Sequence, residues 1–279
     1  MSPSTTAVPS ARLLPLARAE QHRAKQLRTY RWAAHGVTFA IGLVGLWLSA
    51  EASYVAALLA ACSESVAWVL RQRSRARHQH AEKGKRIAEL RLFYDPSAAT
   101  GAETDFRRAV SSWACEHADE QRFDDSDYWD SSPGMGRDSL RRSVREAAWW
   151  SWNLYEEGVK RAGWFAAATV GFALLLLVLF LFVGLAEAAE EVARITLLVI
   201  TGLIGADALS LRADWTAAAS DSRAAHLSLT PPANSEADLF SLYVDYRALT
   251  AGTEPIPDWI YRRHRERLNA AWRAENGAS

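Results

Sequence analysis

The stretch that decides the fold is GWFAAATVGFALLLLVLFLFVGL, residues 163–185, which contains no charged side chain. A helix needs about 20 apolar residues to cross the hydrocarbon core of a bilayer, so this stretch is long enough. It also lacks the polar face that a surface helix of a soluble protein carries. We therefore predict a transmembrane helix here, in preference to a buried core helix of a soluble protein.

Three further apolar stretches have the length of a membrane span: residues 32–50, 52–70 and 195–211. The first two are separated only by Glu51, which predicts a tight helical hairpin. A signal peptide is the alternative for the first stretch, because small residues follow in SAEAS, but a long polar segment precedes it. The mean hydropathy of −0.13 and the formal net charge of zero hide these blocks. Together they predict an all-α membrane protein whose four transmembrane helices form two hairpins with a helical cytoplasmic domain.

The flanking charges predict the orientation of these spans. Basic residues precede the first span, the run RQRSRARHQHAEKGKR follows the second, and the acidic AEAAEEVAR joins the third to the fourth. Because Lys and Arg favour the cytoplasmic side, both termini are expected in the cytoplasm of a multi-pass inner-membrane protein. The predicted segments are a cytoplasmic N-terminal helix, hairpin 1, a cytoplasmic helical region, hairpin 2 and cytoplasmic C-terminal helices, at residues 1–31, 32–70, 71–162, 163–211 and 212–279.

Hydrophobic spacing predicts helices throughout the cytoplasmic segments. The second span is expected to continue to about Tyr94, and an amphipathic helix capped by Thr104 is expected to follow. The loop RFDDSDYWDSSPGMG is interpreted as a solvated acidic loop, since its acids lack EF-hand spacing. A further helix is predicted to run from residue 137 into the third span. Ser235 is predicted to cap a helix that ends near Gly252, and Asp258 to begin the last helix.

The sequence holds no pattern typical of an enzyme. The Walker A loop, GxSxG, HExxH and the protein-kinase motifs are absent, and no Cys/His group has zinc spacing. His78 and His80 are two residues apart, so they are expected on different faces of a helix. Cys62 and Cys115 are expected to stay unpaired and to act as packing residues. We therefore predict a non-enzymatic protein without a metal or cofactor.

Two acids stand inside the apolar stretches, Glu64 in the second and Asp207 in the fourth. An ionisable group that faces lipid costs several kcal/mol, so such residues usually face a bundle interior or water and carry a function. We interpret both as intramembrane polar or gating residues. The alternative is a neutral carboxyl that is hydrogen-bonded to a neighbouring helix. Small residues on several spans also favour a homo-oligomer.

Five stretches, in this order around two pairs of spans, carry a resemblance to a known family. They are LLPLARAEQHRAKQLR (13–28), KGKRIAELRLFYD (83–95), DYWD (127–130), REAAWWSWNLYEEG (145–158) and IPDWIYRRHR (256–265). The chain thereby resembles the SMODS-associating four-transmembrane effectors of bacterial antiphage defence. The last stretch is most similar, to the family's C-terminal DWIY signature.

The resemblance implies a cyclic-nucleotide-responsive effector of CBASS-type immunity. A cGAS/DncV-like nucleotidyltransferase would be its functional partner and a cyclic oligonucleotide its activating ligand. The effector would act on the lipid bilayer by membrane disruption or pore formation and cause abortive infection. The alternative function is a membrane scaffold or sensor that passes a cytoplasmic signal to a partner protein.

A cyclic oligonucleotide is a polyanion with several bases, so Arg and aromatic side chains are expected to bind it. The predicted pocket comprises Arg141, Arg145, Trp149 and Trp150 with Tyr261, Arg262 and Arg263. The tryptophans have an alternative role as interfacial and core residues. The basic run after the second span is interpreted as a collar for anionic lipid headgroups, in preference to a site for a nucleic-acid polymer.

Overall fold

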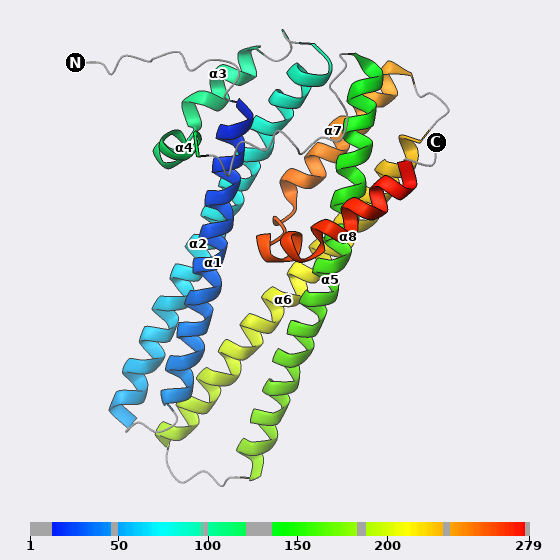
Figure 1. Ribbon diagram of the computed structural model, residues 1–279. Helices are drawn as coiled ribbons and strands as arrows, with labels where there is room; N and C mark the ends of the chain where they lie inside the picture. The colour runs from blue at the N-terminus through cyan, green and yellow to red at the C-terminus, as the bar shows by residue number, and fades with distance from the viewer. Residues whose placement is uncertain are drawn as a thin grey trace, which may run out of the picture. The chain divides into compact units, whose positions relative to one another are not determined.

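The computed structural model describes residues 13–45, 50–95, 97, 100–120, 136–182, 188–230 and 235–276, and the regular secondary structure within them is helical. The eight helices of these residues confirm the all-α prediction, and no strand occurs among them (Figure 1). The helices are α1 (Leu13–Gly45), α2 (Ala50–Phe93), α3 (Thr100–Ala109), α4 (Ser112–His117), α5 (Arg137–Phe182), α6 (Ala188–Ser228), α7 (Glu236–Gly252) and α8 (Asp258–Asn276).

The helices form two compact units. Unit 1 comprises residues 1–25, 75–152 and 220–255, and unit 2 comprises residues 26–74, 153–219 and 256–279. The four long helices α1, α2, α5 and α6 therefore contribute residues to both units. Both predicted hairpins, residues 32–70 and 163–211, fall wholly within unit 2, whereas the predicted C-terminal segment 212–279 is divided between the units.

Unit 2 is built by contacts among α1, α2, α5 and α6, with α8 added on α5. Ala60 of α2 and Ile204 of α6 form its buried apolar centre, against which Trp32, Phe39 and Ile41 of α1 pack. Aromatic pairs join α1 to α5, because the Trp32 ring meets Phe165 at 5.2 Å and the Phe39 ring meets Phe172 at 5.4 Å between centroids. The Ser63 hydroxyl of α2 donates to the Ala34 carbonyl of α1 at 3.1 Å.

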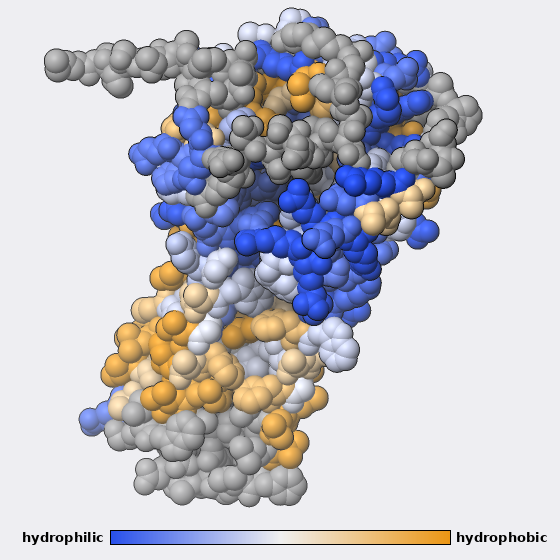
Figure 2. All heavy atoms as spheres, in the orientation of Figure 1, coloured by the Kyte–Doolittle hydropathy of each residue, from blue (hydrophilic) through white to orange (hydrophobic). Residues whose placement is uncertain are grey.

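Large apolar side chains are exposed on the surface of unit 2. Of the exposed large hydrophobic residues that the structure describes, all but Leu92, Leu227 and Val244 lie in this unit. Figure 2 shows them as the orange area over the helices of the unit. They come from all four long helices and include Val37, Val44, Tyr54, Val55, Leu58, Leu59, Val66, Trp68, Val69, Trp164, Phe165, Val170, Leu174, Leu175, Leu177, Val178, Ile195, Val199, Leu203 and Leu209.

One helix of the described residues, α2 over Glu51–Phe93, is long and apolar enough by itself to cross a membrane. The centre of the third predicted span falls on side chains that lie outside the described residues, including 176 and 179–187. Part of the fourth predicted span does so as well. The exposed cysteine Cys62 lies on α2, and Cys115 on α4 is also exposed and unpaired, so the prediction that both are packing residues is wrong.

Unit 1 has two buried apolar clusters. In the first, Phe93 of α2 packs with α5, α6 and α7, through Leu140, Leu229 and Tyr243 among others. In the second, α1, the end of α2, α3 and α4 meet around Phe106. Gly84 makes this possible, since a Cβ atom there would lie 2.4 Å from the Phe106 ring.

The helix predicted across residues 104–117 is in fact two helices. Thr104 lies inside α3, which begins at Thr100, so the predicted cap at Thr104 is wrong. Helix α3 ends at Ala109, and Ser111 caps α4 by accepting a hydrogen bond from the Ala114 amide at 3.2 Å. The apolar spacing continued across the break and therefore gave no signal for it.

Other helix boundaries follow the predictions closely. α2 continues to Phe93, α5 runs from Arg137 into the third predicted span, and α7 ends at Gly252. Ser235 forms a capping box with Asp238 at the start of α7, as its sequence position predicts. Gly136, just before α5, has a φ of 112°, and its amide donates to the Phe93 carbonyl at 2.8 Å. The predicted acidic loop and the DYWD motif lie outside the described residues.

Candidate functional site: a buried ionic cluster

Asp207 of α6 is paired with two arginines from two other helices of unit 2. One carboxylate oxygen lies 3.0 Å from a guanidinium nitrogen of Arg31 on α1, and the other lies 2.8 Å from Arg71 on α2. The Arg31 side chain is 1% exposed and that of Asp207 is 10% exposed. This carboxylate therefore links three helices through ion pairs, of which the one with Arg31 is shielded from water and the one with Arg71 is partly exposed.

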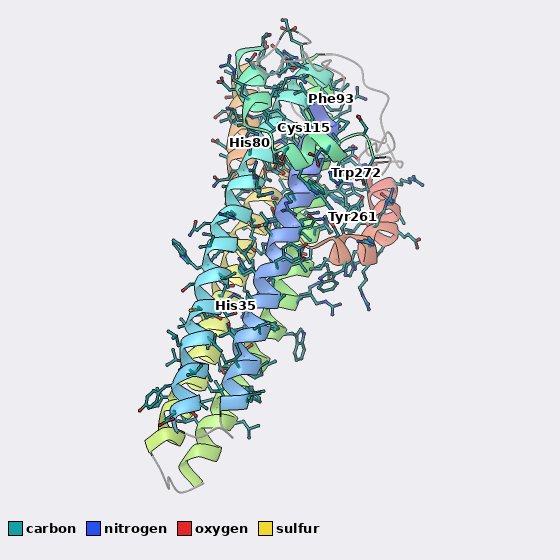
Figure 3. All side chains as sticks on the ribbon, turned by 90° about the vertical axis from the view of Figure 1, so that its left-hand side faces the viewer. His35, His80, Phe93, Cys115, Tyr261 and Trp272 are labelled. Atoms are coloured by element: carbon teal, nitrogen blue, oxygen red, sulfur yellow. The ribbon has the colours of Figure 1, made fainter. Side chains whose placement is uncertain are left out.

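His35 extends the cluster along α1. Its Nδ1 lies 3.0 Å from a carboxylate oxygen of Glu64 on α2, and its Nε2 lies 3.8 Å from Asp207. Figure 3 labels His35 on α1. The two arginines, the histidine and the two carboxylates form one connected group, which we call the ionic cluster: Arg31, His35, Glu64, Arg71 and Asp207.

Aromatic rings surround the arginines of α1. The Arg31 guanidinium lies 5.3 Å from the centre of the Trp32 ring, and that of Arg28 lies 5.0 Å from the centre of the Trp215 ring on α6. Such contacts stabilise a cation by about 0.5–1 kcal/mol at exposed sites and by about 2 kcal/mol where the cation is desolvated.

The ionic cluster makes the contact of α6 with α1 and α2 depend on charge. Removing one partner of a buried ion pair typically costs about 3–5 kcal/mol, because it leaves the other charge desolvated without compensation. Replacing the whole group by apolar residues costs much less. The arrangement is therefore suited to a contact that is stable when complete and easily opened when one member is lost.

The predicted residues Glu64 and Asp207 are brought together in this cluster, bridged by His35. The structure pairs both with cationic or titratable side chains, whereas the alternative prediction was a neutral carboxyl. Arg31, His35 and Arg71 were not predicted as members, since the basic residues that flank the spans were used only to predict the orientation of the spans. Helical spacing was the available signal: Arg31 and His35 are one turn apart, and Glu64 and Arg71 are two turns apart.

Unit 1 contains a separate buried ionic network around Arg247 of α7. Its guanidinium contacts Glu89 of α2 directly and lies 3.6 Å from Glu82, which is two turns before Glu89 on the same helix. The Lys85 ammonium donates to Glu82 at 2.8 Å. One turn earlier on α2, the His78 ring hydrogen-bonds the Thr250 carbonyl at 3.0 Å. These contacts attach α7 to the part of the long helix α2 that belongs to unit 1.

The network shifts the pKa values of its members in different directions. Burial opposes ionisation of Glu82, but the charges of Lys85, His78 and Arg247 outweigh it and lower its pKa to about 2. Burial raises the pKa of Glu89 in spite of Arg247, and burial lowers the pKa of Lys85. Burial also raises the pKa of Tyr246 to about 12, and its hydroxyl is hydrogen-bonded to that of Ser151 at 2.8 Å. These are the signs of a tightly packed structural network.

The predicted ligand pocket divides between the two units. Arg141, Arg145, Trp149 and Trp150 lie on α5 in unit 1. Tyr261, Arg262 and Arg263 lie on α8 in unit 2.

Within unit 1, Trp149 is 4% exposed and meets Trp150 edge to face at 5.7 Å, which favours the packing role for Trp149. Arg141 lies 3.9 Å from Asp138, and the backbone carbonyl of Arg145 is hydrogen-bonded to His226. On α8, Arg262 and Arg263 are exposed and Tyr261 is half-buried (Figure 3 labels Tyr261).

The described residues hold no group of three or more His, Cys, Asp or Glu side chains placed to bind a metal ion. His78 and His80 face different neighbours, since the His80 ring stacks on Phe106 at 4.7 Å. Comparison with models of protein families, with curated proteins and with solved structures finds no match for this chain. Functional inference therefore rests on the chemistry of the two units.

Proposed function

We propose that the chain is a four-span membrane protein whose ionic cluster holds the spans in a closed arrangement until a cytoplasmic signal opens them. The observation that carries this proposal is the combination, in unit 2, of exposed apolar side chains on all four long helices with charged residues buried between them. Soluble proteins place these residue types the other way round.

The apolar surface supports the membrane part of the proposal. Burying one Val, Leu, Ile or Phe side chain contributes about 1.5–3 kcal/mol, so leaving this many exposed to water is very unfavourable. Contiguous apolar surface of this extent marks contact with a membrane or another protein. A bilayer would cover the apolar side chains of all four long helices at once, and the basic flanks favour a cytoplasmic location for both termini.

The ionic cluster supports the gating part. Ionisable residues at membrane depth are costly and are retained where they line a pathway or control an opening. Separating α6 from α1 and α2 would expose Arg31, Arg71 and Asp207, and these charges require water once they lose one another. Opening therefore hydrates the interior of the bundle, which is the event that makes a bilayer leak.

The proposed biological role rests on the resemblance of five sequence stretches to the four-transmembrane effectors. We propose an inner-membrane effector of CBASS-type antiphage immunity, which responds to a cyclic oligonucleotide made by a partner nucleotidyltransferase and causes abortive infection. Homo-oligomers in the membrane would widen the hydrated path. Unit 1, with its buried network between α2 and α7, is the part suited to receive the signal, because α2 continues from it into the spans.

The test is release of a small dye and of ions from liposomes that contain the purified protein. Adding a panel of cyclic di- and trinucleotides is expected to release the contents with at least one of them. Integral insertion is checked in parallel by resistance to alkaline extraction. Intact liposomes with every nucleotide, together with a partner protein that co-purifies in equal amounts, would instead favour the scaffold or sensor function.

A further inference from the structure

Helix α8 is attached to α5 by its N-terminal half. Glu157 of α5 accepts a hydrogen bond from Arg267 at 3.0 Å and lies 3.7 Å from the His264 ring. Ile260 and Leu268 are buried, so the same side of α8 makes an apolar contact. Ile260, His264 and Leu268 recur at four-residue steps and Arg267 lies three residues after His264, so these side chains share the face of α8 that packs on the rest of unit 2.

The attachment point lies next to the apolar surface of α5. The Arg161 guanidinium lies 5.8 Å from the centre of the Trp259 ring, at the first turn of α8. Trp164, which is 78% exposed, follows only three residues later on α5. With a rise of about 1.5 Å per residue, α8 is attached roughly 5–10 Å along α5 from the first exposed aromatic residue. The headgroup layer of a bilayer is about 5–8 Å thick on each side.

The free side of α8 has the composition that a membrane interface favours. Trp259 is 52% exposed, and Arg262, Arg263 and Arg265 are all exposed. Figure 2 shows the hydrophilic, blue surface that the helix carries, and Figure 3 labels Tyr261 and Trp272 on it. Tryptophan is enriched where hydrocarbon meets headgroups, and arginine binds phosphate through two parallel hydrogen bonds.

We infer that α8 is a lipid-binding helix, which binds the anionic phospholipid headgroups of the cytoplasmic leaflet through Arg262, Arg263 and Arg265. The inference rests on the proposed four-span insertion of unit 2. It assigns a partner to α8, which contributes no residue to the ionic cluster. A membrane fits better than a soluble partner, because Arg262 and Arg263 follow the exposed Trp259 by one turn of α8, and the attachment point on α5 lies at headgroup distance from the exposed Trp164. Anionic lipid therefore holds α8, and through Glu157 it steadies the cytoplasmic end of the third predicted span.

The experiment measures hydrogen exchange of the full-length protein in nanodiscs, with and without phosphatidylglycerol in a phosphatidylcholine bilayer. Each basic residue near an anionic surface shifts the docking equilibrium by about five-fold. We expect the amides of residues 258–276 to exchange at least about five-fold more slowly with the anionic lipid. The double variant Arg262→Gln/Arg263→Gln is expected to lose this difference, whereas the matched double variant Arg108→Gln/Arg142→Gln, at exposed arginines of unit 1, is expected to keep it.

The outcomes separate this inference from the proposed function. If the protein is integral to the nanodisc but amide hydrogen exchange in α8 does not depend on lipid charge, the lipid-binding role is wrong and the four-span proposal stands. If alkaline extraction removes the protein from the bilayer, the four-span proposal fails first. If inorganic pyrophosphate slows α8 equally in a neutral bilayer, the arginines bind soluble phosphate and the inference is overturned.

Discussion

Substituting Asp207 by asparagine is the sharpest test of the ionic cluster. The change keeps the shape of the side chain but removes the charge that two guanidinium nitrogens share at 3.0 and 2.8 Å. At an effective dielectric constant of about 20, each of these contacts is worth about 5–6 kcal/mol before desolvation is counted. Removing one member of a buried ion pair has a net cost of about 3–5 kcal/mol.

That cost is expected to fall on the closed arrangement. Because the proposed open arrangement hydrates Arg31 and Arg71, the ratio of closed to open protein should drop by about two to four orders of magnitude. We expect Asp207→Asn liposomes to leak dye without any nucleotide, and the melting temperature of the protein in detergent to fall. Asp221→Asn is the matched control, since it makes the same change at an exposed position of the same helix.

A compensated variant separates gating from loss of folding. Arg31→Met and Arg71→Met combined with Asp207→Leu replace the paired charges by apolar groups, so the melting temperature should recover and the bilayer should stay sealed. The reasoning is refuted if Asp207→Asn matches the wild type in both melting temperature and leakage. Equal leakage from Asp207→Asn and Asp221→Asn would also refute it.

Three further predictions concern unit 1. Arg247→Met should destabilise the protein by about 3–5 kcal/mol in denaturant unfolding, because Glu89 loses its buried cation and Glu82 is left with the Lys85 ammonium, whereas Asp245→Asn at an exposed site should change little. Gly84→Ala should cost about 1–3 kcal/mol, because the new methyl group meets the Phe106 ring at 2.4 Å, while Gly101→Ala, with nothing within 4 Å, should be neutral or slightly stabilising. Glu82, whose pKa is lowered, stabilises the fold above its unfolded pKa of 4.5, and this stabilisation is lost as the pH falls toward about 2. Glu89, whose pKa is raised, has the opposite effect, because its ionisation as the pH rises destabilises the fold. Acid unfolding of Glu82→Gln should therefore be flatter than that of the wild type below pH 4.5, and an unchanged acid limb would show that the network does not control it.

Much of the helical architecture could be predicted because it depends on local patterns. Apolar blocks gave the long helices, and the capping residue Ser235 and the break at Gly252 gave the bounds of α7. The division into α3 and α4 was missed, since one apolar face runs through both helices while the break is made by Ser111 and by the amide of Ser111 contacting Glu20. A backbone contact of this kind, between residues 91 positions apart, leaves no periodic signal.

The candidate site was predicted only in part. Glu64 and Asp207 stand out because a carboxylate within an apolar stretch is expensive. Arg31 and Arg71 do not stand out, because basic residues at the end of a span have an ordinary explanation in membrane orientation. Their pairing with Asp207 needs α1, α2 and α6 to meet at one depth.

The sequence by itself determined that the chain is helical, where its apolar blocks lie and which two carboxylates are costly, because composition and period act residue by residue. Only the tertiary structure decided which charges meet. Side chains from residues 31, 35, 64, 71 and 207 become neighbours only when separate helices pack, and the strength of an ion pair depends on distance and on the exclusion of water. The same holds for α8, because only the tertiary structure shows that Arg267 pairs with Glu157 of α5, seven residues before the exposed Trp164.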